Sequence, residues 1–195
     1  METIQHETVA GMLHDLGLDA GHTSPSLRQL SDTDSKYLRD LKLNVAAVLG
    51  SKNIVRKDAL LLALAVVVNE KHEALTAAFE SLARNEGASE AELSEIHSCT
   101  SLMSANNIFY RFKHYLSEAD YYQNTPAGLR MSIMMNPVIG KELFELTSLV
   151  VSAVNGCERC VTAHERSVRE LGSTEARIYD AVRLAAVIKS LSVII

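Results

Sequence analysis

Proline and glycine are scarce in this sequence, with three and nine of them respectively among 195 residues. Apolar residues recur at spacings of three and four rather than two, which is the period of an amphipathic helix and not of a strand. Asn155-Gly156 is flanked by helical patterns, so it predicts a break between two helices rather than a β-hairpin. We therefore expect an all-α protein.

Long apolar runs and basic stripes are also missing. The longest apolar run, residues 59–68, is about half of what a membrane-spanning helix needs and predicts a buried core helix. The net charge is −5, and no basic stripe is interleaved with aromatics, so nucleic acid is not an expected partner. Residues 1–20 do not resemble a signal peptide, so we expect a cytoplasmic protein with no membrane partner.

The chain is long enough for one compact domain, and we expect a single helical domain over residues 1–195. Residues 120–136 are the best candidate connector, because they lead into Pro137 and contain Gly128. A first half, 1–119, would then lack a close cysteine pair, and a second half, 137–195, would contain one. The predicted helices lie near residues 3–16, 25–31, 35–49, 58–69, 72–85, 89–104, 106–117, 140–154, 157–171 and 174–193.

Some residues of the first half recur in the second at an offset of 85 positions. In both places a long predicted helix ends at a glycine and a capped helix follows, so a helical unit is expected to occur twice. The residues that recur are Ala78, Glu80, Arg84, Gly87 and Glu90, which match Ala163, Glu165, Arg169, Gly172 and Glu175.

Cysteine is rare as well, and three cysteines without an export signal do not suggest a disulfide scaffold. In a reducing compartment the close pair Cys157 and Cys160 is expected to be catalytic or metal-binding. Cysteines three apart on a helix lie on one face, so a dithiol and a disulfide can interconvert there. Cys157 would open a helix after Asn155-Gly156, where free amides and the positive dipole end favour a thiolate. We therefore predict that one of the two is a thiolate at neutral pH.

His164 lies one helical turn after Cys160, on the same face. Its neutral imidazole could accept a thiol proton, and a carboxylate on its other nitrogen could fix the tautomer. Glu145, on the preceding predicted helix, is the candidate for that carboxylate. Arg159 adds local positive charge that favours a thiolate. The pair with its histidine therefore predicts a thiol-redox centre.

Two other interpretations of these residues stay open. Cys157, Cys160 and His164 follow the apolar pattern of a helix, so they could simply belong to the core, as is expected for the isolated Cys99. The same three residues with Glu145 could also bind zinc in a non-enzymatic module. Structural zinc sites usually have a second C-x-x-C or H-x-x-x-H, which this sequence lacks, so no metal site is predicted.

These residues also resemble a known family, the AhpD alkyl hydroperoxidases of the carboxymuconolactone decarboxylase-like superfamily. The most specific part of the likeness is the pattern E-x11-C-x-x-C-x-x-x-H that begins at Glu145. The resemblance covers most of the chain from about residue 41. The stretches that carry it are residues 106–111, 128–131, 136–137, 144–145, 151–157 and 160–165.

The resemblance implies an all-α homotrimer of subunits with two pseudo-repeated halves and a lipoyl-dependent peroxidase activity. Cys160 would attack an organic hydroperoxide and Cys157 would then close the disulfide, while His164 and Glu145 would relay protons. No cofactor would be bound. Reduced lipoyl groups (dihydrolipoamide) on a 2-oxoacid dehydrogenase component would restore the dithiol, and the protein would support a peroxiredoxin, alkyl hydroperoxide reductase C.

One position departs from the family pattern. Better-known members have a histidine directly before the second cysteine, where this chain has Arg159. A guanidinium stabilises a thiolate but does not shuttle protons at working pH. The alternative function is therefore a thiol-disulfide oxidoreductase that passes electrons to a peroxiredoxin without significant peroxidase activity of its own.

Overall fold

The computed structural model describes residues 7–195, and within them it is entirely helical, with no β-strand. The prediction of an all-α protein is thus confirmed. Of the predicted helix 3–16, residues 3–6 lie outside the described part. The elements are α1 (Glu7–Asp15), α2 (Pro25–Asp32), α3 (Lys36–Leu49), α4 (Arg56–Asn69), α5 (Glu73–Asn85), α6 (Glu90–Tyr115), α7 (Asp120–Asn124), the 3-10 helix η1 (Ser132–Met134), α8 (Lys141–Val154), α9 (Glu158–Glu170) and α10 (Glu175–Ile194).

One long helix, α6, replaces the two predicted helices 89–104 and 106–117, so that prediction was wrong at residue 105. The helix begins at a capping box in which Ser89 and Glu92 exchange hydrogen bonds. Asn107 lies in its middle, where an asparagine can break a helix by bonding to its own backbone. Here its side chain bonds to α8 instead, through Ser152 Oγ at 2.8 Å. Because that polar group is satisfied elsewhere, the helix continues.

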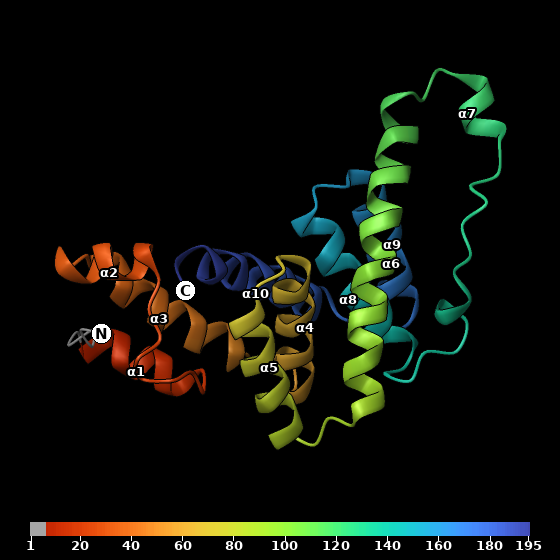
Figure 1. Cartoon of the computed structure of the whole chain (residues 1–195). Helices are drawn as coiled ribbons and strands as arrows, with labels where there is room; N and C mark the ends of the chain where they lie inside the picture. The colour runs from red at the N-terminus through yellow and green to blue at the C-terminus, as the bar shows by residue number, and fades with distance from the viewer. Residues whose placement is uncertain (1–6) are drawn as a thin grey trace.

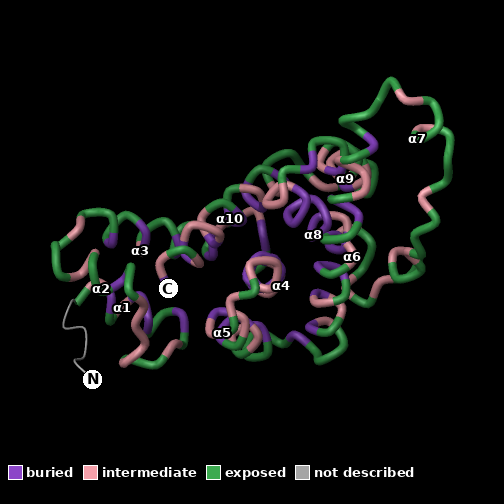
Figure 2. The backbone as a smooth tube through the Cα atoms, turned by 45° about the horizontal axis from the view of Figure 1, so that its top comes forward, coloured by how far each residue is buried: buried purple, intermediate pink, exposed green. Residues whose placement is uncertain are grey.

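The centre of the molecule is α4, whose residues 59–67 are all fully buried (Figure 2). This confirms the core helix predicted from the apolar run. No helix in residues 7–195 is long and apolar enough to cross a membrane. Around α4 pack α5, α6, α8 and α10, while α1, α2 and α3 form the opposite end of the molecule (Figure 1).

The predicted connector 120–136 is a strap that contains α7 and η1. Figure 1 shows α6 projecting beyond the body, with α7 at its far end and the strap returning to the start of α8. Glu95 of α6 anchors the end of this return, since its carboxylate accepts hydrogen bonds from the amides of Val138 (2.8 Å) and Ile139 (2.7 Å). The strap therefore holds η1 beside α6 and α8.

The helix bounds recur at the same offset as the repeated residues. Helix α8 (Lys141–Val154) begins and ends 85 positions after α4 (Arg56–Asn69), and α9 does so relative to α5. Both units also carry an ion pair across the following turn, at 2.6 Å between Arg84 and Glu90 and at 2.6 Å between Arg169 and Glu175. The matching bounds and ion pairs are consistent with two related units, and the duplication itself stays a prediction.

An ion cluster joins three core helices. Arg177 of α10 donates to Asp58 of α4 (2.8 Å) and to Glu142 of α8 (2.9 and 3.0 Å). Burial opposes ionisation of Glu142, but hydrogen bonds from Arg177 and Ser173 outweigh it and keep the pKa of this carboxyl below its usual value. The resulting stabilisation is present above about pH 4.3 and is lost as the pH falls through the lower pKa of the folded state.

Replacing Arg177 by methionine is expected to lower the free energy of unfolding by about 2 kcal/mol, because two partly buried carboxylates lose their cation. Urea denaturation measures this loss. The matched control is Arg166→Met, since Arg166 is 78% exposed and pairs with Glu170 at 4.0 Å; we expect a change below about 0.5 kcal/mol there. Equal effects of the two substitutions would contradict the prediction.

Candidate active site

The turn between α8 and α9 places the cysteine pair. Gly156 has a φ of +67°, a conformation that a side chain would disfavour, and it lets the chain reverse directly after α8. The amide of Cys157 then bonds to the carbonyl of Ser152 at 3.1 Å. Cys157 therefore stands at the N-cap position of α9, where the predicted dipole end and free amides are.

Cys157 and Cys160 are joined by a disulfide, and their Cα atoms lie 5.3 Å apart. Cys157 is completely buried, whereas Cys160 retains 5% of its surface. The local spacing on α9 thus brings both sulfurs together as predicted. Of the two, only Cys160 keeps some surface exposed to solvent.

His164 of α9 and Glu145 of α8 meet beside this pair. His164 Nδ1 lies 2.7 Å from Glu145 Oε2, and the two side chains are only 13% and 18% exposed. A carboxylate at Nδ1 holds the proton on that nitrogen and leaves Nε2 as the acceptor. The structure therefore brings together the imidazole and the carboxylate that the sequence paired, in a geometry that suits proton transfer.

Arg159 lies at the rim of the site and contacts α6 and α7. Its guanidinium carbon is 5.9 Å from the centre of the Tyr110 ring, and Nη1 lies 3.4 Å from Gln123 Oε1. The side chain is thus held between the two helices of the projecting arm. Arg159 precedes Cys160 in the sequence, but these contacts hold its positive charge on the exposed side of α9, toward α6 and α7.

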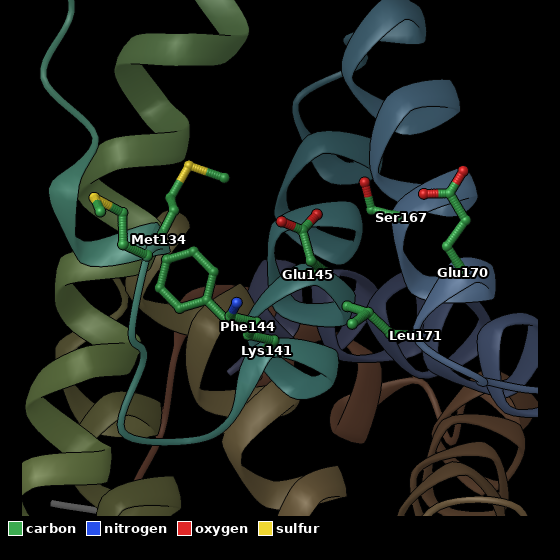
Figure 3. Close-up of a pocket in the computed structure, with 8 residues that line it drawn as sticks. Met134, Lys141, Phe144, Glu145, Ser167, Glu170 and Leu171 are labelled. Carbon is green, nitrogen blue, oxygen red and sulfur yellow. The ribbon is translucent and has the colours of Figure 1, made fainter.

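A pocket of about 300 Å³ opens onto Glu145 between the strap and α9. Figure 3 shows Met134 and Phe144 on one side, Glu145 in the middle, and residues of α9 on the other side. The remaining lining residues are Met135, Lys141, Ser167, Glu170 and Leu171. Glu145, the partner of His164, is therefore accessible from a cavity with both apolar and charged walls.

Comparisons with known proteins agree on one family. The model of the carboxymuconolactone decarboxylase family matches residues 121–192, which contain the whole of α8 and α9. Several relatives are named alkyl hydroperoxide reductase AhpD. The relative from Bradyrhizobium sp. strain BTAi1 is 36% identical over 170 residues, which are 87% of this chain and 93% of the relative. Those from Azorhizobium caulinodans (38% identical over 168 residues, 86% of this chain and 92% of the relative) and Coxiella burnetii (37% identical over 169 residues, 85% of this chain and 94% of the relative) are similar. This chain belongs to the AhpD family.

An asparagine network in this AhpD family member holds the turn between α8 and α9 in place, and the sequence did not indicate this role. The side-chain amides of Asn69 and Asn155 bond to each other (2.9 and 3.1 Å). Asn155 also donates to Asn107 (2.9 Å), and Arg111 donates to the Asn155 carbonyl at 2.6 Å. Asn107 and Arg111 both lie in the stretch 106–111 that carried the family resemblance, which was the available signal.

The third cysteine, Cys99, takes no part in the disulfide. It is fully buried on α6, and its Sγ lies 3.5 Å from Ser148 Oγ. Burial raises the pKa of the Cys99 thiol to about 12. Its placement in the core agrees with the sequence prediction. In the described part of the chain, no group of three or more His, Cys, Asp or Glu side chains is arranged to hold a metal ion.

We expect Cys99 to stay unmodified in the folded, reduced protein, because a thiol with a pKa near 12 is almost never ionised at neutral pH. After reduction, iodoacetamide should modify the pair in the folded protein, Cys160 first because only this sulfur keeps exposed surface, and should leave Cys99 unlabelled. All three cysteines should react in urea. Intact-mass spectrometry counts the adducts. Labelling of Cys99 at the rate of the other two in the native protein would contradict this expectation.

Proposed function

We propose that this chain is a peroxidase that reduces organic hydroperoxides with the dithiol of Cys157 and Cys160 and is itself reduced by dihydrolipoamide. The observation that carries the proposal is the 2.7 Å contact between His164 and Glu145 beside a helix-capping cysteine pair, in a chain of the AhpD family. A nucleophile, a base and a carboxylate that orients the base are the parts of an activated thiol.

In the proposed reaction the Cys160 thiolate attacks one oxygen of the hydroperoxide. The O–O bond breaks, Cys160 becomes a sulfenic acid, and the other oxygen leaves as an alcohol after taking a proton. Cys157 then attacks the Cys160 sulfur, which forms the disulfide and releases water. Dihydrolipoamide returns two electrons and two protons to the disulfide and becomes lipoamide. The greater exposure of Cys160 supports its role as the attacking sulfur.

His164 and Glu145 are proposed to manage the proton. Nε2 of His164 takes the proton of the Cys160 thiol and gives it to the leaving alkoxide. Glu145 holds the proton on Nδ1 and stabilises the imidazolium that forms between the two events. The position of the pair at the positive end of α9 further favours the thiolate.

The partners are proposed from the same reaction. The lipoyl group would come from a lipoyl-bearing 2-oxoacid dehydrogenase component in the cytoplasm, and the electrons would also support a peroxiredoxin, alkyl hydroperoxide reductase C. The subunit is proposed to form a homotrimer. Large exposed apolar side chains on the projecting arm support a contact between subunits there; they are Ile108 (65%), Tyr115 (73%) and Tyr121 (75%).

A second candidate function is thiol-disulfide exchange with a peroxiredoxin without significant direct peroxidase activity. Arg159 favours it, since this residue replaces a proton-carrying histidine and its guanidinium contacts Tyr110 and Gln123. Under this alternative the same cysteines carry electrons, but they reach peroxide through the peroxiredoxin.

A coupled assay separates the two candidates. The purified protein is mixed with an alkyl hydroperoxide and dihydrolipoamide, with and without a peroxiredoxin, and peroxide loss is measured. Rapid loss without the peroxiredoxin supports the peroxidase. Loss that requires the peroxiredoxin supports the exchange function, and no loss in either mixture overturns both.

A further inference from the structure

The pocket and the cysteine pair share one face of α9. Cys160, His164, Ser167 and Leu171 are spaced by four, three and four residues, so their side chains follow one line along the helix. Ser167 and Leu171 line the pocket, and Glu145 connects it to His164. With a rise of 1.5 Å per residue, the pocket walls stand about 10 to 16 Å along the helix axis from Cys160. A molecule that reacts at Cys160 therefore extends toward the pocket only if it carries a chain.

Four of the eight lining residues are apolar and suit an apolar chain. Met134 and Met135 come from the strap, Phe144 lies beside Met134 and comes from the first turn of α8, and Leu171 directly follows α9 (Figure 3). Methionine side chains are flexible and polarisable, so they adapt to chains of different shape. Glu95 holds the strap segment that follows these methionines, which keeps this wall in place.

The charges of the pocket leave one cation without a partner. Glu145 bonds to His164, and Glu170 pairs with Arg166 at 4.0 Å. Among residues 7–195, Lys141 has neither a hydrogen-bond acceptor nor an ion-pair partner for its ammonium. Lys141 is also the first residue of α8, and no side chain caps that helix end. An ammonium and the positive end of a helix thus meet at the pocket, which favours an anion there.

We propose that the pocket binds the carboxylate end, with the adjoining apolar chain, of a carboxylic-acid hydroperoxide such as a fatty-acid hydroperoxide. The apolar chain lies between the strap and α9, its carboxylate pairs with Lys141, and its hydroperoxide group reaches Cys160. The assignment rests on the proposed peroxidase function and adds a substrate class to it. The lipoyl arm does not match this pocket as well, because its far end is an uncharged amide when attached to protein.

Binding is tested first without any reaction. A hydroxyoctadecadienoic acid, the reduced form of such a hydroperoxide, and its methyl ester are titrated calorimetrically into the protein. We expect the acid to bind about tenfold more tightly than the ester, since only the acid pairs with Lys141. Lys141→Gln should remove the difference by weakening the acid alone. Lys52→Gln, at an exposed position away from the pocket, is the matched control and should leave both affinities unchanged.

A second variant blocks the chain rather than the charge. Ser167→Phe adds a ring inside the pocket and should weaken both ligands by at least about tenfold, whatever their charge. Helical circular dichroism checks that this variant is folded. If it does not fold, Lys141→Gln alone still decides the matter, since Lys141 is exposed. Equal binding of acid and ester to the wild type overturns the proposal.

Turnover then separates this proposal from the peroxidase function. We expect a higher kcat/KM for the acid hydroperoxide than for its methyl ester, and loss of that preference in Lys141→Gln. Peroxidase activity without any preference overturns the substrate class and leaves the peroxidase function standing. Acid-selective, Lys141-dependent binding without peroxide turnover supports the binding site and overturns the peroxidase function.

Discussion

Replacing Cys160 by serine is expected to abolish peroxide consumption with dihydrolipoamide, with a loss of more than about a thousandfold. A serine hydroxyl at this place is not ionised at neutral pH, whereas the Cys160 thiol, one helical turn from His164 and in the first turn of α9, is the proposed thiolate. Cys160 is the only group proposed to attack the O–O bond, so no other residue replaces it in this variant. Peroxide loss under saturating dihydrolipoamide measures the effect.

Two further serine variants sharpen this result. Cys157→Ser keeps the attacking sulfur but removes the resolving one, so we expect a single equivalent of peroxide to be consumed and a sulfenic acid to accumulate. Cys99→Ser removes a buried thiol that takes no part in the disulfide and should keep normal activity. Full activity of Cys160→Ser would contradict the proposed role of Cys160 as the attacking sulfur. Consumption of a single equivalent of peroxide by Cys160→Ser, and not by Cys157→Ser, would reverse the roles of the two cysteines.

Replacing His164 by alanine is expected to lower kcat by about a hundredfold or more, the usual range for a lost general acid–base group. Glu145→Gln should lower kcat less, by about tenfold, because glutamine keeps a hydrogen bond to Nδ1 but cannot stabilise an imidazolium by charge. The thiol of Cys160 should also ionise at higher pH in both variants. The ultraviolet absorbance of the thiolate, followed against pH in the reduced protein, measures this shift.

The chain offers a matched control for this pair. His97 Nε2 lies 2.8 Å from Glu80 Oε1, so a second histidine–glutamate contact of similar length exists in the first half of the chain. His97→Ala should leave both kcat and the thiolate titration unchanged. An equal loss of activity in His97→Ala and His164→Ala would show that the effect is on stability and not on proton transfer.

Several features of the fold followed from local chemistry. The helix that starts at Ser89 is marked by a capping box, and the break at Asn155-Gly156 is marked by a residue that tolerates positive φ. The predicted division of α6 at residue 105 was wrong, and the Asn107 side chain shows what a local reading leaves out. Its amide bonds to Ser152, 45 residues away, and local propensity contains no information about such a partner.

The site residues also differ in whether short-range spacing or helix packing brings them together. Cys157, Cys160 and His164 lie on one helix, so their spacing alone placed them on one face, and the structure agrees. Glu145 belongs to another helix. Its contact with His164 depends on how α8 and α9 pack after the turn at Gly156, which the sequence suggested but did not establish.

The pocket depended entirely on packing. Met134 reaches it from the strap, Lys141 from the start of α8 and Leu171 from the end of α9, and no sequence interval relates these three positions. Their proximity follows from Glu95 holding the strap and from the burial of α4, against which α8 packs. Short-range spacing was sufficient for the cysteines and the histidine because one helix repeats every 3.6 residues. The carboxylate partner and the substrate cavity required the tertiary structure, since contacts between helices depend on the packing of the whole core.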